Sequence, residues 1–502
     1  MTPGAWMGQR LQLAQNAAKD GDPATCVKLL LDAVQPMPRR FGAPEAMAFV
    51  AKAHLAARQA HKGEVAGLTA VRLASNLVET ELLFDTWVNL CSFSGQLKSF
   101  EEAYAYGLKA ERIKEGDPDL EANLSMAAVF TGREDEALRR FEKLKTTSPV
   151  KAGAVEAYFR PGAADIPEMT PTTHLDCKDI LNRIRSSVER WAMEELQAAV
   201  AELGRQPDGM GARDCWMELC RFYFRLIEVA DDDEFLIFQG YAGIAAASAK
   251  GINLDLAEAD RGLLLWKWRA LALRQLRLYD DAAAVLQHLA ALVPHNPELA
   301  QMLEDCRARA AAAATTETLL RAAESAVRMP RLFWDAYDLY QDAFFRRGET
   351  LDQRIDRSHA LHSKAYDLFH TNRPEAVALL CQAAASVPDI AHTWQELATI
   401  HFLMRRFREA EQFQRYAVAL VDTDSPLPDD AGRYWFNLAN IRLNRVKAEP
   451  AFSPERHGAK LQQAAEDAQR ALQLGDKRAQ AILGEASSML HRAAPRWWKV
   501  WS

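Results

Sequence analysis

The sequence lacks several features that would assign it to a class at once. None of its 502 residues belongs to a run of about 18 uninterrupted apolar residues, so no segment is expected to span a membrane. The first twenty residues lack the basic start and apolar run of a secretory signal. The seven cysteines are scattered and show no CxxC spacing, which argues against a disulfide framework or a zinc ribbon. A soluble protein of a reducing compartment, the cytoplasm, is expected.

Positive charge is not in excess either. Lys and Arg number 61 and Asp and Glu number 68, which gives a net charge of −7. Proteins dedicated to nucleic acid usually concentrate positive charge, so we do not expect nucleic acid as the partner. Phosphate-binding, dinucleotide-binding, metalloprotease, serine-hydrolase and calcium-loop motifs are all missing, and strand-like alternation is scarce. We therefore predict no enzyme, no cofactor and no metal site.

What the sequence does contain is a repeat of about 34 residues. Counting from Phe84, Trp87 is at position four, Leu90 at seven, Ala103 at twenty and Ala110 at twenty-seven. The next unit carries matching residues at Leu124, Ala137, Leu144 and Pro149. A unit that starts at Ala391 carries them at Trp394, Leu397, Ala398, Ala410 and Ala417. Small residues at fixed positions let helices approach closely, while Trp and Leu fill the adjoining space.

These residues resemble the tetratricopeptide repeat (TPR) family, whose unit is an antiparallel helix pair. The resemblance implies an all-α fold, an α-solenoid that winds into a TPR-like superhelix with a divergent helical middle. We predict five segments: TPR-like repeats over 1–150, an irregular Pro/Gly connection over 151–178, a divergent helical middle over 179–330, TPR-like repeats over 331–491, and a Trp-rich basic tail over 492–502. In the middle we expect helices over 179–203, 212–229 and 233–250, and a capped helix that starts after Thr315.

Asparagines recur at position six of the repeats. In the TPR family this position lies on the first helix of each pair and faces the concave groove. Asn89, Asn123 and Asn437 occupy it, and Asn440 lies at position nine of the same unit as Asn437. The row resembles the asparagine ladder of the repeat domain of O-linked N-acetylglucosamine transferase. An amide offers both a donor and an acceptor to the backbone of an extended peptide, so these four residues are the candidate ligand-binding residues. The alternative is that they are only solvated polar residues.

Other candidate sites are weaker. A TPR clamp for C-terminal carboxylates needs basic residues at position five, where this chain has Val88, Gln395 and Phe436. His359, His362 and His370, with Cys381 as the nearby thiol, could supply metal ligands. A solvated or inter-helix histidine face is the interpretation that we favour for them.

The tail is the last candidate. Trp497, Trp498 and Trp501 lie beside Arg496 in the final residues. Exposed aromatic residues flanked by cations suggest a docking peptide. A tail that folds back and caps the last helix of the solenoid is the alternative, and the one that we favour.

The function predicted from the sequence is that of a scaffold or adaptor that holds a protein or peptide segment in the concave groove. One alternative is a regulatory or assembly factor that senses a small molecule or peptide through its divergent middle. The aromatic residues Trp334, Tyr337, Tyr340, Phe344 and Phe345 would then line a pocket, although helical spacing favours a core role. A lower alternative is an enzyme with an unrecognised site.

Overall fold

A computed structural model describes residues 4–57, 59–74, 80–159, 177–203, 210–230, 233–252, 259–312, 315–329, 332–423, 428, 430–449 and 454–493. Over these ranges the chain forms helices and no strand, which confirms the predicted all-α fold. In the same ranges no helix is both long and apolar enough to cross a lipid bilayer.

The helices belong to two compact units. The N-terminal unit comprises Arg10–Pro38 and Gly42–Ala313, and the C-terminal unit comprises Met1–Gln9, Arg39–Phe41 and Ala314–Ser502. Helix α1 (Ala5–Lys19) begins in the C-terminal unit and continues in the N-terminal unit. The two units are defined by which residues pack together, whereas the five segments predicted from the sequence are defined by their repeat pattern. The five segments therefore stay a prediction.

The further helices of the N-terminal unit are α2 (Pro23–Val34), α3 (Ala43–Ala56), α4 (Ala60–Ala74), α5 (Thr80–Gln96), α6 (Phe100–Ile113), α7 (Pro118–Phe130), α8 (Glu134–Thr147), α9 (Pro149–Val155), the 3₁₀ turn η1 (Glu156–Phe159), α10 (Cys177–Arg190), α11 (Met193–Leu203), α12 (Met210–Val229), α13 (Glu234–Ile252), α14 (Ala259–Gln275), α15 (Tyr279–Leu292) and α16 (Pro297–Ala312). The C-terminal unit contains α17 (Thr316–Val327), α18 (Phe333–Arg346), α19 (Leu351–Leu368), α20 (Arg373–Ser386), α21 (Ala391–Leu403), α22 (Phe407–Val421), α23 (Ala431–Ala448), α24 (Pro454–Gln473) and α25 (Ala479–Ala493).

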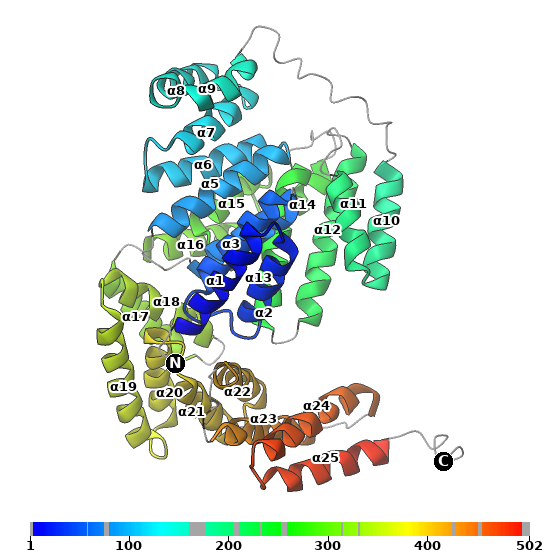
Figure 1. The fold of residues 1–502 in the computed structure, drawn as a ribbon, viewed down its shortest axis with the longest axis vertical. Coiled ribbons are helices and arrows are strands. Elements are labelled where there is room, and N and C mark those ends of the chain that lie inside the picture. The colour runs from blue at the N-terminus through cyan, green and yellow to red at the C-terminus, as the bar shows by residue number, and fades with distance from the viewer. Residues whose placement is uncertain are drawn as a thin grey trace. The chain divides into compact units, whose positions relative to one another are not determined.

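The repeat positions fall where the TPR pattern requires them. Each predicted unit is a pair of consecutive helices that pack together, such as α5 with α6, α7 with α8 and α21 with α22 (Figure 1). The small residues Ala103, Ala110 and Ala398 are buried between the helices. Gly132 makes the turn between α7 and α8 with a φ of 72°, a conformation that glycine adopts without strain. The predicted solenoid of TPR-type helix pairs is confirmed.

The middle of the chain departs from the expected helices in two places. The single helix expected over 179–203 is two helices, α10 and α11, separated at Trp191, whose φ is 54°. The amide of Ala192 donates to the carbonyl of Ser187 at 2.9 Å, which closes α10 with a left-handed C-terminal turn. The expected connection over 151–178 begins instead with the end of α9 and with η1, and its residues 160–176 lie outside the described part. Thr315 does cap α17, accepting from the amide of Thr318 at 3.2 Å.

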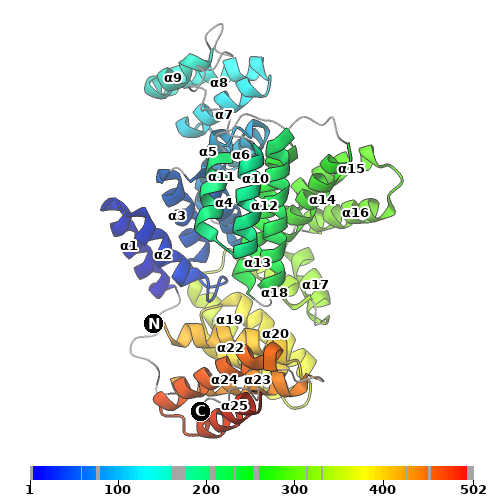
Figure 2. The same ribbon diagram turned by 90° about the vertical axis from the view of Figure 1, so that its right-hand side faces the viewer.

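In the N-terminal unit, the middle helices pack against the first repeats. Helix α13 contacts α4, α12 and α14, and Figure 2 shows α10, α12 and α13 side by side. Lys250 of α13 forms a buried ion pair with Glu64 of α4, and Ser94 of α5 donates to the same carboxylate at 3.1 Å. The first repeats and the divergent middle therefore share one core.

Candidate functional site

The first helices of the C-terminal repeats carry polar residues on one face. On α21, Trp394, Leu397 and Ala398 are completely buried, so His392 and Glu396 lie on the opposite, more accessible side. These two residues are four apart and share one face of the helix. We define the first-helix surface as five of the side chains at repeat positions two and six of α19, α21 and α23: His362, His392, Glu396, Arg433 and Asn437. The sixth residue at these positions, Ser358 of α19, is buried and is not part of the surface.

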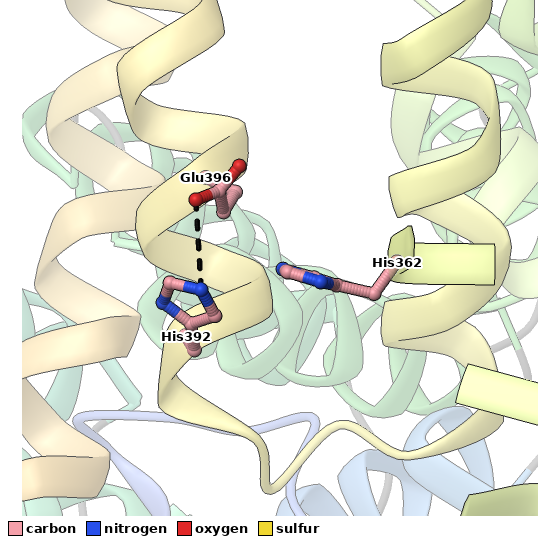
Figure 3. A group of neighbouring side chains, drawn as sticks. All are labelled: His362, His392 and Glu396. Carbon is pink, nitrogen blue, oxygen red and sulfur yellow. Dashed lines mark ion pairs between the residues drawn. The ribbon is translucent and has the colours of Figure 1, made fainter. Parts of the chain in front are cut away.

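Three members of this surface converge. His362 of α19 points toward His392 and Glu396 of α21 (Figure 3), and one potential ligand atom from each of the three lies within 4.8 Å of the others. The Nε2 of His392 is 3.5 Å from Oε1 of Glu396, and the rings of His392 and His362 are centred 4.8 Å apart. Burial lowers the pKa of His362, and the neighbouring His392 and His359 lower it further. Burial raises the pKa of Glu396, against the opposing effects of His392 and Arg433.

Arg433 and Asn437 continue the first-helix surface onto α23. The Nη2 of Arg433 donates to Oε1 of Gln395 at 3.1 Å, which joins α23 to α21, and it pairs with Asp430 at 3.2 Å. Asn437 lies one turn further along and is partly exposed. Among the described residues, none forms a hydrogen bond with its side-chain amide.

The structure places the four predicted asparagines in two different units. Asn89 of α5 and Asn123 of α7 belong to the N-terminal unit, on neighbouring helices, and both are partly exposed. Asn437 and Asn440 are both on α23 in the C-terminal unit, where Oδ1 of Asn440 accepts from Nδ2 of Asn444 at 2.9 Å. The asparagines thus form two separate pairs, and the acceptor of Asn440 is already used within its own helix.

The aromatic residues of α18 are mainly core. Tyr337 is fully buried, Trp334 packs against it with ring centres 5.6 Å apart, and Phe344 is buried beside Tyr340. The side chain of Phe345 lies outside the described part. Tyr340 also borders a cavity of about 420 Å³ between α17, α18, α20 and the end of α21, where its hydroxyl accepts from Nε2 of Gln382 at 3.2 Å. Of the suggested pocket residues whose side chains are described, Tyr340 alone lines this cavity.

The other histidine and tail candidates do not gather into a site. His359 and His370 are exposed, and Cys381 is buried on α20, where its thiol donates to the carbonyl of Phe333. His362 is thus near His392 and Glu396 rather than near Cys381. The predicted docking residues Arg496, Trp497, Trp498 and Trp501 lie outside the described residues.

Neither His392 nor Glu396 was among the functional candidates predicted from the sequence. A signal was present, because His362 and Glu396 both occupy position six and His392 occupies position two of the same repeats. Reading the histidines by repeat position, rather than by nearness in the sequence, would have grouped these three.

Comparisons with known proteins concern the fold. No family model and no curated protein matches the sequence. A solved tetratricopeptide repeat protein from Parabacteroides merdae is similar at 11% identity and a TM-score of 0.27, over 61% of this chain and 100% of that one. The Naa15/Naa10 complex bound to HypK-THB shows 14% identity and a TM-score of 0.24, with 97% and 78% covered. Yeast Tom70 shows 10% identity and a TM-score of 0.22, with 97% and 95% covered. The assignment of TPR-type repeats rests on the helix pairs of this chain itself.

Proposed function

We propose that this protein is a scaffold that binds an extended segment of another protein along its first helices. In the C-terminal unit the surface for such a segment is the first-helix surface, and in the N-terminal unit a separate surface contains Asn89 and Asn123. The function needs positioned donors and acceptors rather than catalysis.

The observation that carries the proposal is the row of polar side chains on α19, α21 and α23. It lies over a repeat core in which Trp394, Leu397 and Ala398 are completely buried, so we do not expect the polar residues to be needed to close that core. An amide such as that of Asn437 can bond both N–H and C=O groups of an extended peptide, and such contacts read the main chain rather than its sequence. Arg433 adds a cation that favours an acidic side chain of the bound segment.

The test is binding of the full chain to an array of extended peptides of varied sequence. We expect Asn437→Ala, and separately the pair Asn89→Ala and Asn123→Ala, to weaken peptide binding to the unit that carries the substitution by about five- to thirtyfold for each hydrogen-bonding amide that is removed. The thermal midpoint should stay within a degree or two, since these amides bond to no other side chain or backbone group among the described residues. Asn182→Ala, at an exposed position of α10, is the matched control. Equal reductions of binding and stability would contradict the proposal, because they would identify structural amides.

The cavity beside Tyr340 supports a second candidate function, the sensing of a small molecule. Its volume of about 420 Å³ suits a small ligand, and Gln382, His401 and Arg406 supply polar groups beside apolar ones. A ligand present at 100 times its Kd should stabilise the fold by about 2.7 kcal/mol, which a thermal-shift screen with small metabolites would detect. Absence of any such shift, with peptide binding intact, would eliminate this candidate.

A further inference from the structure

The histidine pair of the first-helix surface lies in a geometry that peptide binding alone does not require. His392 and Glu396 project from successive turns of α21, and His362 reaches toward them from α19 (Figure 3). The residues come from two different repeats, and two imidazoles with one carboxylate form a donor set typical of transition-metal sites. We propose that His362, His392 and Glu396 form a binding site for Zn²⁺.

The distances are close to those that a zinc ion imposes. Ligands about 2.0–2.1 Å from a tetrahedral zinc ion are separated from one another by roughly 3.3 Å. The His392 and Glu396 atoms are already 3.5 Å apart, and the widest separation in the group is 4.8 Å. The side chain of His392 is 47% exposed, so it can rotate to close the remaining distance without disturbing the core.

His362 supplies a second reason. Its Nε2 is buried and has no hydrogen-bond partner among the described residues. A buried polar atom without a partner is costly, and a metal ion is one kind of partner that would satisfy it.

Three protein ligands leave one position of a tetrahedral ion open. Water, or a carboxylate, imidazole or thiolate of a bound segment, would take that position. Metal binding is independent of the proposed scaffold function: a chain that binds Zn²⁺ but no peptide would refute the scaffold and leave the site standing.

The experiment is a titration of the metal-stripped full chain with Zn²⁺ by calorimetry, and with Co²⁺ by its visible absorption. We expect one bound ion and a Co²⁺ spectrum of tetrahedral intensity. His362→Ala, His392→Ala and Glu396→Gln should each weaken binding at least tenfold, while His359→Ala and His370→Ala, at exposed histidines near the same helix, should leave it unchanged. Thermal midpoints of the metal-free variants check that each still folds.

A variant of Arg433 provides a further test of the zinc site. Its expected result is tighter binding, which a partly unfolded variant would not show. The positive charge of Arg433 acts on Glu396 and opposes a cation at the same place. Arg433→Gln should therefore tighten Zn²⁺ binding several-fold. The proposal is overturned if the His362, His392 and Glu396 variants bind like the unmodified chain, or if the His359 and His370 variants are weakened as much as they are.

Discussion

His61 illustrates how much a single buried residue can control stability. It lies in α4 with its Nε2 3.0 Å from the hydroxyl of Tyr223, beside the ring of Trp216, while its Nδ1 has no partner among the described residues. Burial, together with a smaller effect of the charge of Lys250, lowers the pKa of His61 to about 3. The folded chain therefore holds this imidazole neutral at pH values where the unfolded chain protonates it.

The sign of the resulting pH dependence follows from this difference. Between the unfolded pKa near 6.5 and the folded value of about 3, the unfolded state binds one more proton, so stability falls as the pH falls. The slope from this one group is at most about 1.4 kcal/mol per pH unit. His61→Gln keeps a polar side chain and removes the titration. We expect its urea-unfolding free energy, measured from pH 7 to pH 4, to decrease less on acidification than that of the unmodified chain.

His295→Gln, at an exposed position after α15, is the control for this series and should keep the original pH profile. An unchanged slope in the His61 variant would show that other groups cause the acid sensitivity. His54 is one such group, because burial lowers its pKa to about 4.

At the scale of the element, helix contacts depend on glycines that leave room for a neighbour. A Cβ added at Gly63 of α4 would lie 2.3 Å from the ring of Phe93 on α5, whereas one added at Gly95 of α5 would meet nothing within 4 Å. Alanine favours a helix over glycine by about 1 kcal/mol, but overpacking a core costs about 1–3 kcal/mol. Gly63→Ala should therefore be net destabilising and Gly95→Ala neutral or stabilising, as thermal unfolding of the two variants will show. A stabilised Gly63→Ala variant would mean that α4 and α5 separate easily.

The elements also show why sequence reasoning succeeded in one part of the chain and failed in another. The repeat positions of Trp, Leu and Ala predict helix pairs because spacing along a helix decides which residues meet. The break at Trp191 escaped prediction, since a bulky residue rarely adopts the positive φ that ends α10 there. The packing of α13 on α4, with its Glu64–Lys250 pair, joins residues 186 apart in sequence, and no local pattern contains that information.

In the candidate site, too, one part could be predicted from the sequence and another part could not. The repeat register predicts that His362, Glu396 and Asn437 occupy equivalent positions of successive first helices. It does not predict that the side chains of His362 and His392 turn toward each other, because this depends on the spacing of α19 and α21 and on their rotamers.

At the scale of the whole molecule, unit membership does not follow chain order. Residues 1–9 and 39–41 belong to the C-terminal unit although the segments next to them belong to the N-terminal unit. Asp389, after α20, holds both segments: its carboxylate accepts from the amides of Gly4 and Phe41 at 3.0 Å each and faces Arg40 at 3.8 Å. Arg39 adds a buried ion pair with Asp338, with its guanidinium 4.2 Å from the ring centre of Trp334. One carboxylate thus ties two early segments of the chain to the C-terminal repeats.

Asp389→Ala tests this tie. The substitution removes the acceptor of two backbone amides and the carboxylate that faces buried Arg40, and breaking a buried ion pair typically costs about 3–5 kcal/mol. We expect a lower thermal midpoint and faster hydrogen exchange in the peptides that contain Gly4 and Phe41, with exchange in α24 and α25 unchanged. Asp367→Ala, at an exposed position of α19, should alter neither measurement. Unchanged exchange at Gly4 and Phe41 in the Asp389 variant would contradict the role of that carboxylate. Segment 39–41 would then be held by Arg39 through its contacts with Asp338 and Trp334, which the substitution does not change.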